Sequence, residues 1–287
     1  MAVAFSAPSV GSVLGPSGLG RVFGDNSGET TEPTFERELS LVFGGGGAFG
    51  IAWHLAVLAA LRDAGFPVKG APAVGTSAGA WACAALRLDV GVEAFESVGD
   101  LAVPDLRRGV LEGVAREIFG DVSVADAKIS AVSLPLLRRR MYHAHEHSVA
   151  DLVAASSAVP GLFAPHYIGG VAHIDGGVRS VDSSDHASSG RLLVASMPLG
   201  GPLMGPVGRA IEASTRFGLG QWRRRHGGET FLLRPGRRLA TFIGMRPTKL
   251  FDVSLAHEVY PIAYEQVSDY IAARRHTLPA ESLSLAA

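Results

Sequence analysis

The chain has 287 residues, of which 47% are hydrophobic and 18% charged, so it can bury a large core. Its 26 basic residues balance 27 acidic ones, and this formal net charge of -1 excludes a general electrostatic attraction to nucleic acid. The single cysteine, Cys83, excludes an intramolecular disulfide framework, and no Cys/His cluster has the spacing of a structural zinc site. We therefore expect a globular cytoplasmic protein without a nucleic-acid partner.

Residues 1–37 are rich in Gly, Pro, Ser and Thr and lack sustained periodicity, which predicts a flexible leader. They lack the basic and apolar regions of a secretory signal. The longest apolar stretch, residues 49–61, is far shorter than the roughly 20 residues that cross a bilayer, so any membrane contact should be peripheral. We expect one ordered domain over residues 38–276 and a tail over residues 277–287.

Two strand–turn–helix units open the expected domain. Residues 39–43 form a short β-prone run that ends in four glycines, and a helical segment follows over residues 50–64. Residues 71–75 form a second strand that leads through Ser77 into a small-residue helix over residues 78–88. Such units favour a three-layer α/β/α fold with a central, largely parallel sheet, in which ligands bind at the carboxyl ends of the strands.

The later segments have weaker patterns. We expect helices over residues 91–119, 149–157 and 256–275, and strands over residues 128–134, 138–144, 171–175, 192–197 and 229–233. Pro261 should fall in the first turn of the last helix, where proline is tolerated. No functional motif is found after about residue 190.

The pentapeptide Gly75-Thr-Ser77-Ala-Gly79 stands between a predicted strand and a predicted helix. A nucleophile at such a turn projects its oxygen from a sharply bent backbone, and glycines two positions away on either side leave room for it. The alternative is a serine that only caps the helix, because serine is a preferred N-cap residue. The pentapeptide alone does not decide between these interpretations.

A glycine run over residues 44–50 precedes the first helix. Glycines let several backbone amides approach one anion, as a tetrahedral oxyanion requires. Gly45, Gly47 and Gly50 also match the dinucleotide-binding pattern G-x-G-x-x-G. That pattern requires an acidic residue at the end of the next strand, and residues 66–76 contain no Asp or Glu. We therefore favour an oxyanion loop over a nucleotide-binding loop.

A serine nucleophile also needs a base to take its proton. The alternating His143, His145 and His147 could line one strand face, although such a run is more often a solvated edge. Asp175 is the better candidate, because it ends a predicted strand and two following glycines leave its carboxylate uncrowded. On spacing alone, an aspartate in a tight Asp-Gly hairpin turn explains this motif equally well.

Three motifs stand in one order: residues 45–50 (GGGAFG), residues 75–79 (GTSAG) and residues 175–177 (DGG). Together they resemble the patatin-like phospholipase family, whose members carry a glycine-rich oxyanion loop, a G-x-S-x-G elbow and a D-G-G/A motif. Residues 155–165 (ASSAVPGLFAP) are similar to the run before the family's catalytic aspartate. The resemblance extends over about residues 39–180.

The resemblance implies a patatin-like fold and a Ser-Asp dyad without histidine, in a phospholipase A or lysophospholipase-like ester hydrolase that needs no metal or organic cofactor. Ser77 would attack the acyl-lipid carbonyl, and Asp175 would take the proton, pass it to the leaving group and later activate water. The oxyanion would be held by amides of Gly45, Gly46 and Gly47. The other motif glycines would support the backbone: Gly50, Gly75, Gly79, Gly176 and Gly177.

Phe49 departs from the family pattern, because Arg or Lys usually precedes the last glycine of the loop. Losing this charge could alter loop anchoring or head-group preference. Two basic runs, residues 138–140 and 222–226, could dock on anionic head groups, with Trp222 at the interface. Short basic runs are more often solvated surface. Besides an acyl hydrolase, two interpretations stay open: a Rossmann-type nucleotide-binding protein and a non-catalytic lipid-binding member of the family.

Overall fold

The structure is a computed structural model, and it describes residues 35, 37–96, 103–243 and 247–274. These residues all fall within one compact unit, Thr34–Ala287. The expected leader over residues 1–37 lies almost entirely outside the described residues, and the expected tail over residues 277–287 lies wholly outside them.

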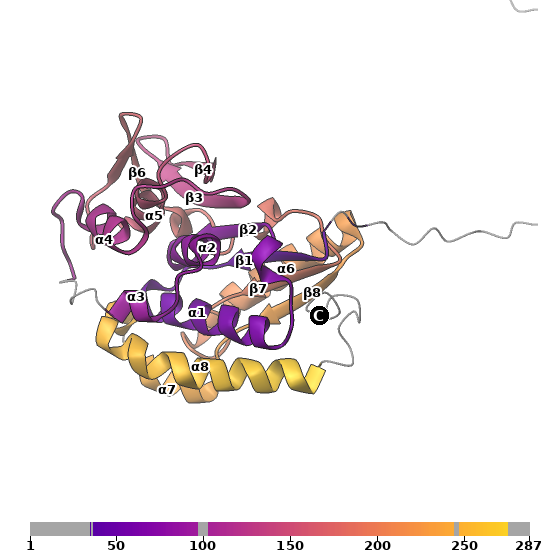
Figure 1. Ribbon diagram of the computed structural model, residues 1–287. Helices are drawn as coiled ribbons and strands as arrows, with labels where there is room; N and C mark the ends of the chain where they lie inside the picture. The colour runs from indigo at the N-terminus through magenta and orange to yellow at the C-terminus, as the bar shows by residue number, and fades with distance from the viewer. Residues whose placement is uncertain (1–34, 36, 97–102, 244–246, 275–287) are drawn as a thin grey trace, which may run out of the picture. The chain divides into compact units, whose positions relative to one another are not determined.

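A central sheet carries the domain (Figure 1), and its strands follow the order β5-β6-β3-β2-β1-β7-β8, with β4 paired to β3. The strands β3, β2, β1, β7 and β8 run parallel to one another, whereas β4 and β6 pair antiparallel with β3, and β5 pairs antiparallel with β6. The bounds are β1 Leu39–Phe43, β2 Ala73–Thr76, β3 Ala127–Ser133, β4 Arg138–His143, β5 His166–Ile168, β6 Val171–Asp175, β7 Leu192–Ser196 and β8 Glu229–Leu233. The expected largely parallel sheet is confirmed.

Helices cover both faces of this sheet. Along β1, Leu41 and Phe43 join a core cluster with α1, α2, α5 and α8, whereas Val42 joins a second cluster with Leu219 and Trp222 of α6. The α-helices are α1 Gly47–Asp63, α2 Ala78–Leu88, α3 Glu93–Glu96, α4 Val110–Phe119, α5 Val149–Ser157, α6 Pro206–His226, α7 Arg237–Ile243 and α8 Val253–Arg274. The 3-10 helices are η1 Val68–Gly70, η2 Gly176–Val178, η3 Ser184–His186 and η4 Pro247–Phe251. The three layers match the expected α/β/α class, and no helix in the described part of the chain is long and apolar enough to cross a membrane.

Three expectations about helices need correction. The continuous helix expected over residues 91–119 is instead the short α3 and the separate α4, which Gly109 precedes with a positive φ of 79°. The helix α6 was not expected, because its sequence is mainly polar and it buries only a few side chains. Pro261 lies inside α8 rather than in its first turn, and it sits on the exposed side of that helix.

Candidate active site

The ends of two strands meet on β3. The strand β2 runs parallel to β3 and ends with Thr76 opposite Ser130, whereas β6 runs antiparallel and ends with Asp175 opposite Ala131. Both strands use the same side of β3, because β4 occupies its other side. The structure therefore brings Ser77, the next residue after β2, beside Asp175, although the two are far apart in the sequence.

Ser77 sits at a sharp turn between β2 and α2. Its backbone has a positive φ of 53°, a conformation that costs a non-glycine residue about 1–3 kcal/mol and often marks a functional site. Ser77 occupies the N-cap position of α2, but its side chain makes no capping hydrogen bond, so its hydroxyl does not serve to cap the helix. A methyl group on Gly75 would lie 2.3 Å from the Gly79 carbonyl oxygen, and one on Gly79 would lie 2.0 Å from the Phe43 carbonyl oxygen. Only glycine fits at either position.

Ser156 holds this turn in place. The Ser77 amide donates to the Ser156 hydroxyl oxygen at 2.8 Å, and the same hydroxyl donates to the Ser130 carbonyl at 2.7 Å. Ser156 lies in α5, within the run that resembles the family, but sequence reasoning gave it no role. Its signal was present only as the Ser-Ser pair of residues 156–157, which has no distinctive chemistry by itself.

Asp175 is buried beside this turn. Its Oδ1 accepts a hydrogen bond from the Gly177 amide at 2.6 Å, while its buried Oδ2 has no hydrogen-bond partner among the described residues. Burial raises the pKa of Asp175 to about 6, although the nearby Ser77 side chain and the Gly177 amide lower it. The Ser77 contact does not reach full hydrogen-bond geometry, which is common before a substrate tightens a site. Gly176 begins the 3-10 helix η2, so the hairpin-turn interpretation of this motif is wrong.

The glycine loop lies next to Ser77, since a methyl group on Gly45 would come within 3.6 Å of Ser77 Cβ. The Gly45 amide donates to the Val181 carbonyl at 2.9 Å, so the expectation that this amide is available to an oxyanion needs correction. The amides of Gly46 and Gly47 have no protein partner among the described residues, and they stand at the positive end of the α1 dipole. These two amides can receive an anion without breaking a bond.

A cavity extends from Ser77 between the helices. Its empty volume is about 910 Å³, part of which is open to solvent. Side chains of α1, α2, α4, η4 and α8 contribute to its walls, which are mainly apolar. The apolar lining residues are Ile51, Ala52, Leu55, Trp81, Val92, Phe95, Val103, Leu111, Val114, Ile118, Phe163, Phe251 and Val253. Sequence reasoning missed this cavity because its walls come from separate segments.

Comparisons with known proteins show similarity over part of the chain. Residues 106–182 match the family described as patatin-like phospholipase. An uncharacterized NTE family protein of Mycobacterium bovis is 31% identical over 156 residues, which cover 49% of this chain and 42% of that protein. Uncharacterized NTE family proteins of two Mycobacterium tuberculosis strains match to the same extent. This chain therefore spans less than half the length of these relatives.

Over part of its length, the chain is similar to the patatin-like phospholipase family. Among solved structures, VipD from Legionella pneumophila matches with a TM-score of 0.36 and 14% identity, covering 82% of this chain and 67% of that chain. The family match includes Asp175 and its two glycines but begins after Ser77. The placement of the serine turn beside Asp175 is therefore known from the sheet register alone.

A buried chain of hydrogen bonds supports the glycine loop. His54 of α1 is fully buried, and its Nε2 lies 2.8 Å from the Gly44 carbonyl oxygen. Because a carbonyl only accepts, Nε2 carries the proton, and Nδ1 accepts from the Ser196 hydroxyl at 2.8 Å. The Trp53 indole donates to the same hydroxyl oxygen at 3.0 Å. Burial lowers the pKa of His54 to about 4, so the ring is neutral at pH 7.

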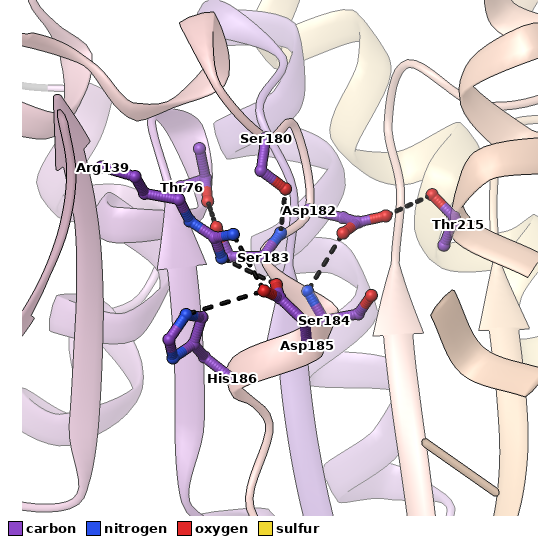
Figure 2. Close-up of polar contacts among 9 residues, drawn as sticks. All are labelled: Thr76, Arg139, Ser180, Asp182, Ser183, Ser184, Asp185, His186 and Thr215. Carbon is purple, nitrogen blue, oxygen red and sulfur yellow. Dashed lines mark hydrogen bonds and ion pairs between the residues drawn. The ribbon is translucent and has the colours of Figure 1, made fainter. Parts of the chain in front are cut away.

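A polar network fixes the segment that follows the Asp175 motif. Figure 2 shows the Ser183 hydroxyl bonded to that of Thr76, at 2.9 Å, and Asp182 bonded to Thr215 of α6, at 2.6 Å. In the same view Arg139 of β4 makes two hydrogen bonds to Asp185, at 2.9 and 2.7 Å. This network holds the chain on either side of Val181, whose carbonyl accepts the Gly45 amide. The segment after the Asp175 motif thus contacts both the strand that leads to Ser77 and the glycine loop.

The other candidate residues lie apart from this pair. His143 and His145 are exposed at the end of β4, on the side of β3 away from β2 and β6. Phe49 is fully buried in the core, so it cannot contact a head group, and Cys83 is likewise a buried core thiol, as expected. Trp222 is buried and donates to the Ser188 carbonyl at 3.1 Å, so the expectation of Trp222 at a membrane interface is wrong.

Within the described ranges, one group has three potential metal-ligating side chains close together: Glu112, Asp151 and His166. His166 Nε2 lies 2.9 Å from Asp151 Oδ1, whereas its Nδ1 lies 3.9 Å from Glu112 Oε2. The two carboxylates therefore engage different ring nitrogens, while Glu112 also pairs with Arg116 at 2.8 Å. This geometry fits an ion-paired cluster between α4, α5 and β5 better than a single ion site.

Proposed function

We propose that the protein is a serine lipid acyl hydrolase, a carboxylic ester hydrolase that uses Ser77 and Asp175 as a catalytic dyad. The observation that carries this proposal is an apolar cavity that reaches a serine at a strained turn, beside a buried aspartate whose Oδ2 has no hydrogen-bond partner among the described residues. An apolar cavity stabilises an acyl chain through the hydrophobic effect. The ester carbonyl at the head of that chain would then lie against the Ser77 hydroxyl.

In the first half of the reaction, Ser77 Oγ attacks the acyl carbonyl while Asp175 Oδ2 takes the hydroxyl proton. The carbonyl oxygen becomes an oxyanion, which the Gly46 and Gly47 amides and the α1 N-terminus stabilise. When the tetrahedral intermediate collapses, the ester C–O bond breaks and Asp175 returns the proton to the leaving alcohol. The products of this half-reaction are the free alcohol and acyl-Ser77.

In the second half, water attacks the acyl-Ser77 carbonyl and gives a proton to Asp175. Collapse of this second intermediate breaks the bond to Ser77 Oγ, which regains the proton and releases a fatty acid. A raised pKa makes Asp175 a stronger base than an ordinary carboxylate, and no histidine is required. The carboxylate must be deprotonated to act, so kcat/KM should rise as the pH increases through about 6 and then level off.

A serine-reactive fluorophosphonate tests the nucleophile. We expect it to label the wild-type chain and to fail on Ser77→Ala. The matched control is Ser157→Ala, because Ser157 lines the same cavity but its hydroxyl accepts the Trp81 indole N–H at 3.0 Å. This control should still be labelled. Labelling of Ser77→Ala at the wild-type level would refute the assignment.

The variant Asp175→Asn tests the base. It should keep the fold by circular dichroism but lose at least 100-fold in kcat on nitrophenyl esters, the order expected for removal of a general base. Near wild-type turnover, or an unchanged pH profile, would require another base. A lipidomic comparison of the wild type with Ser77→Ala would then identify the natural lipid and the ester that is cleaved.

The cavity also fits a non-catalytic lipid-binding role. That alternative would replace the proposal if purified protein bound fatty acids but hydrolysed neither short-chain nitrophenyl esters nor phospholipids. A Rossmann-type nucleotide site has less support, because the apolar lining around the α1 N-terminus provides few partners for a ribose or a pyrophosphate. Calorimetric titration with NAD, FAD and ATP should accordingly give no binding heat.

A further inference from the structure

Three turns on neighbouring parts of the fold carry exposed apolar side chains. The β3–β4 turn presents Leu136 and Leu137, the β5–β6 hairpin presents Tyr167 and Val171, and the loop before α4 presents Leu106. Burying such side chains is normally favourable, so several of them on adjacent turns indicate a contact surface.

Direct contacts connect the three turns. The Leu134 amide donates to the Ala172 carbonyl at 2.8 Å, which joins the β3–β4 turn to β6. In the β5–β6 hairpin Ala172 pairs with Tyr167, and the Arg108 guanidinium stacks over the Tyr167 ring at 5.1 Å. The loop that contains Arg108 is therefore also part of this region. We call Leu106, Leu136, Leu137, Tyr167 and Val171, with Arg108, Arg138 and Arg140, the tip surface.

The tip surface lies at the end of the sheet where Ser77 is found. The strands β2 and β3 are parallel, and β2 ends opposite Ser130, whereas β3 continues to Ser133. At about 3.3 Å per residue, the β3–β4 turn projects roughly 10 Å beyond the end of β2, at the end of the sheet where Ser77 lies. The β5–β6 turn projects in the same direction, because β6 runs antiparallel to β3 and begins at that end. Figure 1 shows β3, β4 and β6 gathered in one part of the sheet.

The charge of this surface indicates what it contacts. Arg138 and Arg140 are exposed and form no ion pair with any described residue, whereas Arg139 between them faces the other way and pairs with Asp185. Arg107 is also exposed but is paired with Asp105. Apolar side chains beside unpaired arginines match a bilayer surface, where leucines enter the head-group region and guanidinium groups contact lipid phosphates.

The second basic run lies at the opposite end. The helix α6 follows β7 from the Ser77 end of the sheet and finishes at His226, just before β8 begins opposite Leu192. Arg223 and Arg224 are therefore far from the end where Ser77 opens, and the nearby Trp222 is buried. Of the two basic runs in the sequence, residues 138–140 are therefore the better candidate for contact with lipid head groups. We propose that the tip surface docks the protein on an anionic lipid bilayer, with Ser77 facing that bilayer.

Vesicle co-sedimentation of the full-length chain tests this inference. It should be carried out in the Ser77→Ala background, so that binding is measured without hydrolysis and separately from the proposed activity. We expect binding to phosphatidylcholine vesicles that contain phosphatidylglycerol and much weaker binding to phosphatidylcholine alone. Equal binding to both, or none to either, would overturn the proposal.

Two pairs of variants locate the surface. The double variant Arg138→Gln/Arg140→Gln should weaken partitioning into anionic vesicles by about fivefold for each arginine, and Leu136→Ser should weaken it further. The matched controls are Arg223→Gln/Arg224→Gln and Phe217→Ser, because Phe217 and Leu136 are both 67% exposed. These controls should bind as the parent does. The tip surface would not be the docking site if the controls lost binding. The same conclusion would follow if the tip-surface variants kept native circular dichroism and bound vesicles as strongly as the parent.

Discussion

His54 shows how a single buried side chain can control the position of a loop that it does not belong to. It donates to the Gly44 carbonyl and is itself fixed by Ser196, which also receives the Trp53 indole proton. Gly44 begins the glycine run that contains the available amides of Gly46 and Gly47, so this chain of hydrogen bonds fixes the start of the proposed oxyanion loop. His54 is therefore a positioning residue in the proposed mechanism rather than a catalytic one.

We predict that His54→Leu lowers kcat for short nitrophenyl esters by about 100-fold while changing KM much less, because misplaced amides affect the transition state most. It should also reduce the free energy of unfolding by about 1–3 kcal/mol, since the Gly44 carbonyl loses its buried partner. His54→Gln, which restores a side-chain donor, should recover part of kcat. A fall in stability without a selective fall in kcat would leave His54 with a structural role only.

Among single residues, the sequence predicted the candidate catalytic side chains better than the residues that hold them in place. Ser77 and Asp175 could be chosen because glycines flank them and because each follows a predicted strand. Ser156, which holds the Ser77 amide, and Val181, which occupies the Gly45 amide, could not be chosen because their contacts form only between distant segments. A short motif reflects the needs of the local backbone, whereas these contacts form only in the tertiary fold.

At the scale of elements, α4 separates two environments. Leu111, Val114 and Ile118 line the cavity, while Glu112 on another side of the helix contacts His166 and Arg116. The apolar side is a helical stripe at spacings of three and four residues, so an amphipathic helix here was predictable. That this stripe faces a cavity rather than a filled core was not predictable, because a helical period has the same appearance in both cases.

Filling this cavity should change chain-length preference. We predict that Val114→Trp lowers kcat/KM for long-chain nitrophenyl esters by about tenfold or more, while short-chain esters are hydrolysed almost normally. The indole would occupy space that a long acyl chain needs. The matched control is Val110→Trp, because Val110 lies on the same helix but does not line the cavity. An equal loss for short and long esters in Val114→Trp would mean that the cavity does not hold the acyl chain.

At the scale of the whole molecule, Asp175 and His54 make the pH dependence of stability a balance of opposite effects. Burial raises the pKa of Asp175 from 3.8 to about 6, so its contribution to stability is present below pH 3.8 and is lost as the pH rises through about 6. Burial lowers the pKa of His54 from 6.5 to about 4, so its contribution is present above pH 6.5 and is lost as the pH falls through about 4. Each shift corresponds to about 3 kcal/mol, and the two nearly cancel between pH 4 and pH 6.5.

Asp175→Asn should remove the contribution of Asp175 to this pH dependence and leave that of His54. We predict that this variant is more stable than the wild type at pH 7.5, because it no longer buries a charge, and that its advantage disappears near pH 4. Urea denaturation from pH 4 to pH 7.5 measures both effects. In the wild type, the contributions of Asp175 and His54 should leave the free energy of unfolding nearly independent of pH over this range. The variant should lose stability on acidification. A variant that is less stable than the wild type at pH 7.5 would contradict this account.

The meeting of β2 and β6 on β3 also bears on how such a protein can diversify. The strand β3 sets the separation of Ser77 and Asp175, so the chain between them is free to make a long excursion. That excursion contains α3 and α4, which contribute to the cavity walls. Lengthening a surface connection costs little free energy, because loop entropy grows only with the logarithm of length. Mutations and insertions in this excursion can therefore reshape the cavity while Ser77 and Asp175 keep their geometry, so in the proposed hydrolase substrate range can evolve separately from chemistry.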